Sequence, residues 1–181
     1  MATRKSKRTM RTLYLLRHAK AVPQEEGGPD RERPLEKRGR RAAKAVAEWM
    51  AEHKVAPALV LCSPSLRTRE TLELVAPEFP HLPEILFEEG LYLATARQLL
   101  TRLRRVPAQT QSVMLVGHNP GFQELAMYLS EVATGALVAR LAAFPTGALA
   151  TFEVESPWSQ LERKQARLTA VAAPKELRGE D

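Results

Sequence analysis

The sequence predicts an α/β fold, a three-layer αβα sandwich built on a mainly parallel sheet. Short apolar runs typical of buried strands alternate with longer segments that are predicted to be helical. The 181 residues have the length of a single domain, and no repeat or interdomain linker divides them. Reactive polar residues follow directly after three of the apolar runs, where an open α/β sheet binds its ligands.

Strand and helix signals alternate through the first half of the chain. Residues 12–17 (TLYLLR) and 58–62 (ALVLC) are short apolar runs and predict buried strands. Residues 35–53 have apolar side chains at helical spacing, and residues 64–75 are predicted as a second helix that the following prolines end. Residues 21–33 are rich in proline, glycine and charge, which is typical of a loop.

The second half continues this alternation. The run SVMLV at residues 112–116 is continuously apolar and predicts a buried strand, whereas residues 147–154 (GALATFEV) alternate and predict a strand near a sheet edge. The remaining predicted elements are a short strand at 85–87 and helices at 95–105 and 121–130. Residues 167–172 are interpreted as a further strand, with a packed extension as the alternative.

The N-terminus carries most of the net positive charge. The formal net charge of the chain is +6, and residues 1–12 contribute +5 of it, which leaves +1 for the rest. The basic residues of this segment are Arg4, Lys5, Lys7, Arg8 and Arg11. We predict a disordered basic arm at residues 1–11, one folded domain at 12–173 and a charged tail at 174–181. An arm that binds nucleic acid or another acidic surface is the alternative, but the neutral body argues against a nucleic-acid partner.

Cysteine usage and hydropathy point to the cytoplasm. Cys62 is the one cysteine of the chain, so an intrachain disulfide is impossible. No apolar run approaches the ~20 residues that span a membrane. The apolar stretch after the basic N-terminus is too short for a signal peptide. We therefore predict a cytoplasmic protein without a membrane partner.

Histidines and arginines collect where three predicted strands end. Arg17 and His18 follow the first strand, Arg67 lies soon after the second, and His118 and Asn119 follow the strand at 112–116. If these strands are neighbours in the sheet, their carboxyl ends bring the five side chains to one edge. Arginine binds phosphate oxygens through two hydrogen bonds and stays charged at any working pH. The set therefore predicts an anion site, most simply a phosphate site.

Two of these junctions also predict helix starts. Ser63 and Asn119 are favourable N-cap residues, and Pro64 and Pro120 suit the first helical position. A helix that begins at once after the strand points its free N–H groups and the positive end of its dipole at the same sheet edge. This prediction adds two helix N-termini to the expected anion site.

Four motifs resemble those of one known family, in that family's order. RHAKA (17–21) is similar to the Arg-His-Gly motif of the histidine phosphatase superfamily, whose fold is called phosphoglycerate-mutase-like. RPLEKRGRRAA (33–43), SPSLRTRETL (63–72) and VGHNPG (116–121) resemble its other signature segments. Ala19 in place of glycine, the Gly-His-Asn-Pro form of the last motif and the short chain resemble the SixA-type phosphohistidine phosphatase branch.

The resemblance implies roles for the clustered residues. It implies that His18 attacks phosphorus and becomes phosphorylated, and that His118, Arg17 and Arg67 complete the catalytic set. Arg17, Arg67, His118 and Asn119 are the expected phosphate ligands. No metal and no other cofactor is expected, because the arginines supply the positive charge.

A general acid is the uncertain part of the expected mechanism. Glu88 and Glu89 lie about where the mutase branch of the family places such an acid, and a solvated acidic turn is the alternative. A phosphohistidine substrate releases an imidazole, which needs less help from an acid than an alkoxide does.

These observations predict a metal-independent phosphatase that forms a phosphohistidine intermediate, with a phosphohistidine protein as its substrate. A phosphatase for small phosphate esters is the first alternative. A non-catalytic module that binds an anion or nucleic acid is the second, but such a module has no use for His18 and His118 at matched strand ends. A cysteine phosphatase is excluded because Thr68 stands where the Cys-x5-Arg motif would place its arginine relative to Cys62. The chain contains neither a Walker A motif nor a His-Glu-x-x-His motif.

Overall fold

The structure is a computed structural model of the chain, which describes residues 9–131 and 134–177. These residues form a six-stranded sheet with the order β3-β2-β4-β1-β5-β6. The strands are β1 (Arg11–Arg17), β2 (Leu59–Cys62), β3 (Glu84–Phe87), β4 (Ser112–Gly117), β5 (Leu149–Val154) and β6 (Ala166–Ala172). Strands β1 to β4 are parallel, and β5 is antiparallel to both of its neighbours. The predicted α/β class with a mainly parallel sheet is confirmed.

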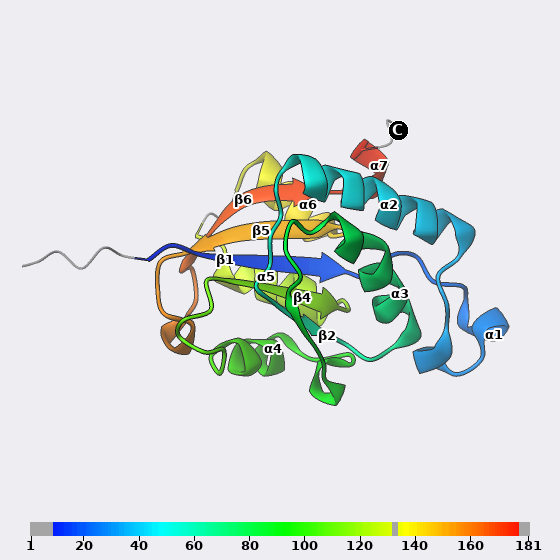
Figure 1. Cartoon of the computed structure of the whole chain (residues 1–181), viewed down its shortest axis with the longest axis horizontal. Coiled ribbons are helices and arrows are strands. Elements are labelled where there is room, and N and C mark those ends of the chain that lie inside the picture. Colours follow the sequence, from blue (N-terminus) through cyan, green and yellow to red (C-terminus); the bar gives the residue numbers. More distant parts are fainter. Residues whose placement is uncertain (1–8, 132–133, 178–181) are drawn as a thin grey trace, which may run out of the picture.

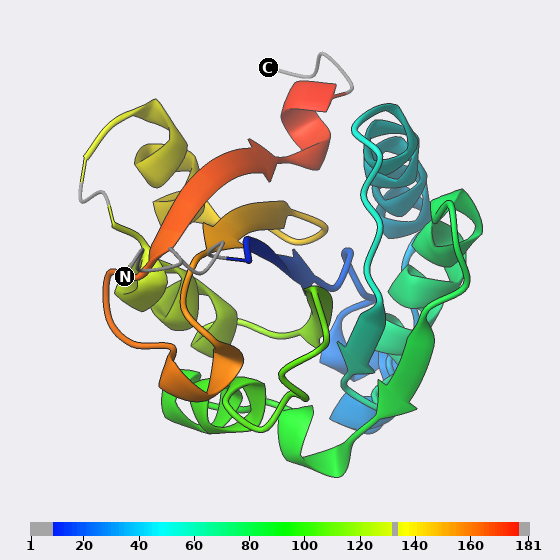
Figure 2. The same ribbon diagram turned by 60° about the vertical axis from the view of Figure 1, so that its left-hand side comes forward.

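Helices cover both faces of the sheet (Figures 1 and 2). The α-helices are α1 (Gln24–Gly27), α2 (Lys37–Glu52), α3 (Leu66–Val75), α4 (Ala96–Leu103), α5 (Gly121–Leu129), α6 (Ala136–Ala143) and α7 (Pro174–Leu177). The 3-10 turns are η1 (Asp30–Glu32), η2 (Ala76–Glu78), η3 (Glu89–Leu91) and η4 (Trp158–Gln160). Figure 2 shows α2 and α3 on one side of the sheet and α4, α5 and α6 on the other.

Strand β1 explains why a central strand of this fold appears in the sequence as one continuous apolar run. Successive side chains of a strand point to opposite faces of the sheet. Leu13 and Leu15 belong to the core under α4 and α5, whereas Tyr14 and Leu16 belong to the core under α2 and α3. Leu13, Leu15 and Leu16 have no exposed surface. Since both faces of β1 are buried, no polar residue interrupts it.

The register of the central strands fixes where their ends meet. Strand β4 lies between β1 and β2, with Arg17 opposite Gly117 and Cys62 opposite Val116. The next residue after each of the three strands is therefore at the same sheet edge, as the sequence predicted.

Every predicted strand and long helix is present, with boundaries that differ by a few residues. Helix α6, preceded by Gly135 with a φ of 114°, has no counterpart among the predicted elements. The segment predicted as a loop, residues 21–33, contains α1 and η1. Both are single short turns, which lack the length that gives a helix its apolar period.

The predicted helix caps were wrong. Helix α3 has Ser65 as its N-cap rather than Ser63, and α5 begins at Gly121 after Pro120 rather than at an Asn119 cap. Ser63 directs its hydroxyl away from the helix and towards a histidine ring. The side-chain amide of Asn119 donates instead to a carbonyl of the α6 end. Tertiary contacts therefore take both side chains away from the helix N-termini.

The predicted tails lie mostly outside the described residues, which exclude 1–8 and 178–181. Arg11, assigned from the sequence to the arm, is the first residue of β1. Helix α7 occupies the start of the segment assigned to the C-terminal tail and packs against α2. Within the described ranges, no helix is long and apolar enough to cross a bilayer.

Candidate active site

A cavity of about 370 Å³ opens at the carboxyl edge of the central strands. All five phosphate-site residues predicted from the sequence line it, namely Arg17, His18, Arg67, His118 and Asn119. Asp30 and Arg33 also line it, although the sequence analysis did not single them out as site residues. The cavity therefore combines three arginines, one lysine, two histidines and one carboxylate.

His18 is held as a neutral ring with a free Nε2 lone pair. Its Nδ1 lies 2.7 Å from the carbonyl oxygen of Ala19. A carbonyl only accepts hydrogen bonds, so Nδ1 carries the proton and Nε2 is left unprotonated. Burial lowers the pKa of His18 to about 4, and the positive charges of Arg67 and Arg17 act in the same direction. At neutral pH the ring is therefore uncharged, and its Nε2 lone pair can act as a nucleophile.

The backbone around His18 is fixed from three directions. The N–H of His18 donates to Gly117 (3.0 Å), and its carbonyl accepts from Gly147 (2.9 Å). The N–H of Ala19 donates to the hydroxyl of Thr71 (3.0 Å). These bonds tie the segment after β1 to β4, to the turn before β5 and to α3, so the position of the ring depends on the whole sheet edge.

Helix α2 also presses directly on this segment. A Cβ built on Gly39 would lie 2.0 Å from the carbonyl oxygen of Lys20, a distance that no side chain tolerates. The glycine of the RPLEKRG motif is therefore explained by the close approach of α2 to the residues that follow His18.

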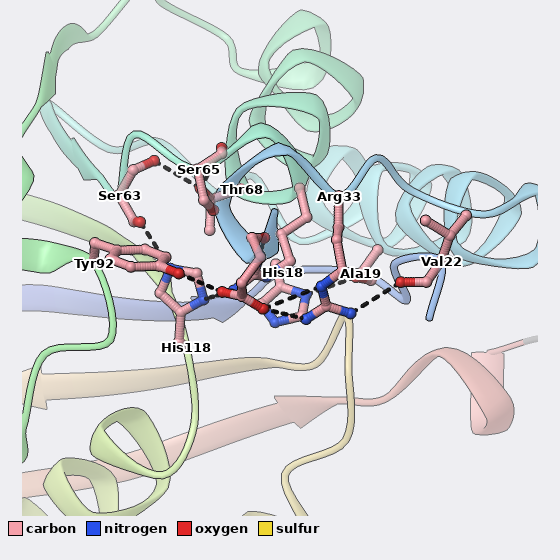
Figure 3. A network of polar contacts seen from close by, with 11 residues as sticks. His18, Ala19, Val22, Arg33, Ser63, Ser65, Thr68, Tyr92 and His118 are labelled. Carbon is pink, nitrogen blue, oxygen red and sulfur yellow. Dashed lines mark hydrogen bonds and ion pairs between the residues drawn. The ribbon is translucent and has the colours of Figure 1, made fainter. Parts of the chain in front are cut away.

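His118 lies beside His18, with 5.3 Å between the ring centroids. Its Nε2 is 2.7 Å from the hydroxyl oxygen of Ser63, and its Nδ1 is 3.4 Å from Nη2 of Arg67 (Figure 3). Because a guanidinium only donates, Nδ1 accepts and Nε2 carries the proton in this arrangement. Burial, followed by the nearby charges of His18 and Arg67, lowers the pKa of His118 to about 3. His118 is also neutral at pH 7.

Arg67 is the most buried cation of the site, with a side chain that is 2% exposed. The threonines of the SPSLRTRETL motif hold the start of α3 around it. Thr71 donates from its hydroxyl to the carbonyl of Arg67 (2.7 Å), and Thr68 donates to the carbonyl of Ser63 (2.7 Å). The motif thus fixes the backbone that carries the arginine and, through Thr71, connects it to the segment that follows His18.

Helix α6 supplies an anchor for the opposite wall. The carbonyl of Phe144, which follows α6, accepts from Nη1 of Arg17 (2.9 Å) and from Nδ2 of Asn119 (3.2 Å). Two side chains from different strand ends are therefore oriented by one carbonyl. This carbonyl belongs to an element that the sequence did not predict.

Asp30 is the carboxyl group of the cavity. It accepts from Nη2 of Arg67 (3.0 Å), from Nη2 of Arg33 (2.8 Å) and from the hydroxyl of Tyr92 (Figure 3 shows Tyr92 and Arg33). Burial raises the pKa of Asp30, but the hydrogen bonds from Tyr92, Arg67 and Arg33 outweigh it and hold that pKa well below its usual range. Asp30 is therefore ionised and holds no proton to give to a leaving group at neutral pH.

The two glutamates predicted as candidates for a general acid are engaged elsewhere. Both carboxylate oxygens of Glu88 accept from the guanidinium of Arg102 at 2.7 Å, which makes a bidentate ion pair. Glu89 pairs with Arg31 at 2.7 Å and has a side chain that is 74% exposed. Neither glutamate lines the cavity. The structure brings together the residues at the strand ends but not this pair.

Sequence reasoning missed Asp30, Arg33 and Tyr92. Arg33 heads the RPLEKRG motif and was quoted only as part of it. Asp30 and Tyr92 are far apart in the chain and meet only because the segment before α2 folds over the cavity. No local pattern marks such a contact.

Cys62 has the environment of a core residue. It is fully buried, and burial raises the pKa of its thiol to about 12. A protonated thiol is a poor nucleophile. In the part of the chain that the structure describes, no group of three or more histidine, cysteine, aspartate or glutamate residues is placed to hold a metal ion.

The chain is similar in sequence to known proteins. A family model described as histidine phosphatase superfamily (branch 1) matches residues 13–92. An uncharacterized protein of Mycobacterium tuberculosis is 32% identical over 164 residues, which cover 88% of this chain and all of that protein.

Two solved structures have closely similar folds. The protein from Nakamurella multipartitia, named as phosphohistidine phosphatase SixA, superposes with a TM-score of 0.80 at 29% identity over 91% of this chain and 96% of its own. The protein of the same name from Agrobacterium tumefaciens superposes with a TM-score of 0.73 at 29% identity over 91% of this chain and 98% of its own. The resemblance inferred from the motifs is confirmed. The chain belongs to the histidine phosphatase superfamily, branch 1.

Proposed function

We propose that this protein is a metal-independent phosphohistidine phosphatase that acts on phosphohistidine in a protein and forms a covalent intermediate on His18. The observation that carries the proposal is the state of His18. Its ring is neutral, its Nδ1 proton is held by Ala19, and its Nε2 lone pair is free beside Arg17 and Arg67. The names of the two solved relatives support the choice of substrate.

In the first step, Nε2 of His18 forms a bond to phosphorus while the bond from phosphorus to the substrate's imidazole nitrogen breaks. The other nitrogen of the substrate's ring is protonated before the bond breaks, so the electron pair of the broken bond leaves on a neutral imidazole. The His18 ring becomes positively charged, and the Ala19 carbonyl stabilises its Nδ1–H. Arg17, Arg67 and the amide of Asn119 bind the phosphoryl oxygens, so the positive charge is supplied without a metal.

In the second step, a water molecule attacks phosphorus and the bond to Nε2 of His18 breaks. The electron pair returns to Nε2, and the proton of the water remains on the released phosphate. The ring is again neutral, as burial favours.

The acid step separates the proposed substrate from small alkyl phosphates. An alkoxide leaving group needs a general acid, which is typically worth about 10² to 10⁴ in rate. The carboxyl group in the cavity, Asp30, is held ionised by Arg67 and Tyr92. Imidazole is a far weaker base than an alkoxide, so a site without a protonated carboxyl favours phosphohistidine. This lack of a protonated carboxyl group in the described cavity is the reason to prefer a phosphoramidate over an ester.

The single buried thiol is compatible with a reducing compartment, and we propose the cytoplasm as the place of this activity. This location depends on composition alone and is separate from the chemistry of the site.

The test compares four substrates in the presence of EDTA: a phosphohistidine peptide, phosphoramidate, an aryl phosphate and an alkyl phosphate. We expect the phosphohistidine peptide and phosphoramidate to be hydrolysed much faster than the alkyl phosphate, and EDTA to have no effect. Equal rates on the alkyl phosphate would favour the small-ester phosphatase instead. Release of phosphate from none of the four would favour a non-catalytic anion-binding module.

A further inference from the structure

A groove of about 280 Å³ adjoins the catalytic cavity. Lys20 and Thr146 line both, so the two share a wall. The far side of this groove is formed by Arg38 of α2 and Lys175 of α7, two helices that pack together (Figure 1). A substrate bound in the catalytic cavity therefore has a direct continuation into the groove.

The charged side chains that line this groove are all cations: Lys20, Arg38 and Lys175. Lys20 is paired with Glu36 at 3.2 Å, outside the lining. Arg38 and Lys175 are exposed and form no ion pair within residues 9–131 and 134–177. The rest of the lining is mostly apolar, so the groove presents unneutralised positive charge above an apolar floor.

The charge pattern of α2 gives independent support. Its first turn contains no acidic residue, although the N-terminus of a helix is the positive end of its dipole and favours acids. Its first half instead carries Lys37, Arg38, Arg40, Arg41 and Lys44. Its acidic residues, Glu48 and Glu52, lie in the second half. The N-cap Glu36 is paired with Lys20 and Arg40 is paired with Glu70, so Arg38 remains as a cation of the first turn that faces the groove without an ion pair in the described residues. An anion bound beside Arg38 would offset this remaining positive charge.

We propose that this groove binds carboxylate side chains of the polypeptide substrate that lie within a few residues of the phosphohistidine. This inference rests on the proposed function. The catalytic cavity takes the phosphoryl group, and Arg38 and Lys175 select substrates in which that group has acidic neighbours. The body of the chain is nearly neutral, so the selectivity comes from local clustering at this groove rather than from net charge.

The test uses two phosphohistidine peptides of equal length, one with aspartates beside the phosphohistidine and one with glycines and serines. The double variant Arg38→Gln/Lys175→Gln should raise KM for the acidic peptide roughly three- to tenfold, because each exposed charge pair contributes modestly. Its kcat, its KM for the neutral peptide and its turnover of phosphoramidate should stay unchanged. High salt should reduce the wild-type preference for the acidic peptide.

The matched control is the substitution Arg163→Gln. Arg163 is exposed and precedes the first residue of β6, whereas the groove lies beyond the carboxyl ends of the strands. The substitution should leave all three substrates unaffected. A charge reversal, Arg38→Glu/Lys175→Glu, should shift the preference to a peptide with lysines beside the phosphohistidine. Thermal unfolding of each variant establishes that the fold is retained.

The outcomes separate this inference from the proposed function. The groove assignment would be overturned if the wild type hydrolysed the acidic and the neutral peptide with equal kcat/KM. It would also be overturned if the glutamine double variant lost the same factor in kcat/KM on both peptides. Either result would leave the proposed function unaffected. Turnover of the aryl phosphate with neither peptide nor phosphoramidate hydrolysed would overturn the proposed function, and the polypeptide occupant of the groove with it.

Discussion

The hydroxyl oxygen of Ser63 lies 2.7 Å from Nε2 of His118, and both residues are buried, at 0% and 2% exposure. A hydroxyl can donate or accept, so Ser63 satisfies either neutral form of the ring. In the present structure Arg67 faces Nδ1 at 3.4 Å, and Nε2 donates to Ser63. When a phosphoryl oxygen takes the place opposite Nδ1, that nitrogen must carry the proton. Ser63 can then reverse its hydrogen bond and donate to Nε2.

Ser63→Ala should therefore lower kcat/KM about tenfold, since Nε2 of His118 loses its partner and a buried hydrogen bond is worth about 1 kcal/mol or more. Ser65→Ala is the matched control. Ser65 is equally buried, but its hydroxyl bonds to Thr68 rather than to His118. Steady-state kinetics of both variants check the prediction. Similar losses in the two variants would mean that Ser63 acts through α3 and not through the ring.

His18→Ala should abolish turnover and leave the fold intact, because the residue lies at a strand end and not within either core. Brief incubation with labelled substrate should label the wild type in a form that is stable to base and labile to acid. The variant should carry no such label. Persistence of acid-labile label in His18→Ala would assign the nucleophile to another histidine.

The activity should show an acid limb near pH 4 rather than near 6.5, because protonation removes the Nε2 lone pair and burial lowers the pKa of His18 to about 4. An aryl phosphate is the substrate for this profile, since phosphohistidine decomposes in acid. A fall in activity already near pH 6.5 would contradict a buried, neutral His18 ring.

The free energy of unfolding should depend on the same two histidines. The unfolded chain takes up protons near pH 6.5 while the folded His18 and His118 do not, so the stability falls as the pH drops from 6.5 towards 4.

Asp30→Asn should lower the melting temperature at pH 7, because Arg67 and Arg33 lose their anionic partner. The pKa of Asp30 is depressed in the folded state, so its contribution is present above the ordinary value of 3.8 and is lost at lower pH. The difference in melting temperature between the wild type and the variant should therefore become smaller below about pH 4. On phosphohistidine, kcat should change only a few-fold. A hundredfold fall, with the fold intact, would make Asp30 the proton donor.

Gly39→Ala should be destabilising and should reduce activity, because its new methyl group would lie 2.0 Å from the carbonyl of Lys20 and displace either α2 or the segment after His18. Overpacking of this kind typically costs about 1 to 3 kcal/mol. Gly90→Ala is the control, since a Cβ there would meet nothing within 4 Å. Thermal unfolding and turnover are measured on both. An unchanged Gly39→Ala protein would show that α2 can move without disturbing the nucleophile.

The sequence alone was sufficient for the individual strands and for the residues at their ends, whereas the order of the strands came from the structure. Buried central strands require continuous apolar runs, and β1 and β4 are such runs. Arg17, His18 and His118 are adjacent in sequence to these runs, so their place in space follows from the strand order. These cavity residues could be named because their position depends on local sequence and on one rule of sheet topology.

Contacts between distant segments were decided only by the tertiary structure. Asp30 meets Arg67 and Tyr92 through the fold of a segment that has no periodicity of its own. Ser63 does not cap α3 because its hydroxyl is paired with a buried nitrogen of His118, and Ser65 takes the N-cap position instead. The basic groove joins Arg38 to Lys175 across the packing of α2 and α7. Hydrophobic periodicity reports the burial of one segment at a time, whereas these pairings depend on how separate segments pack.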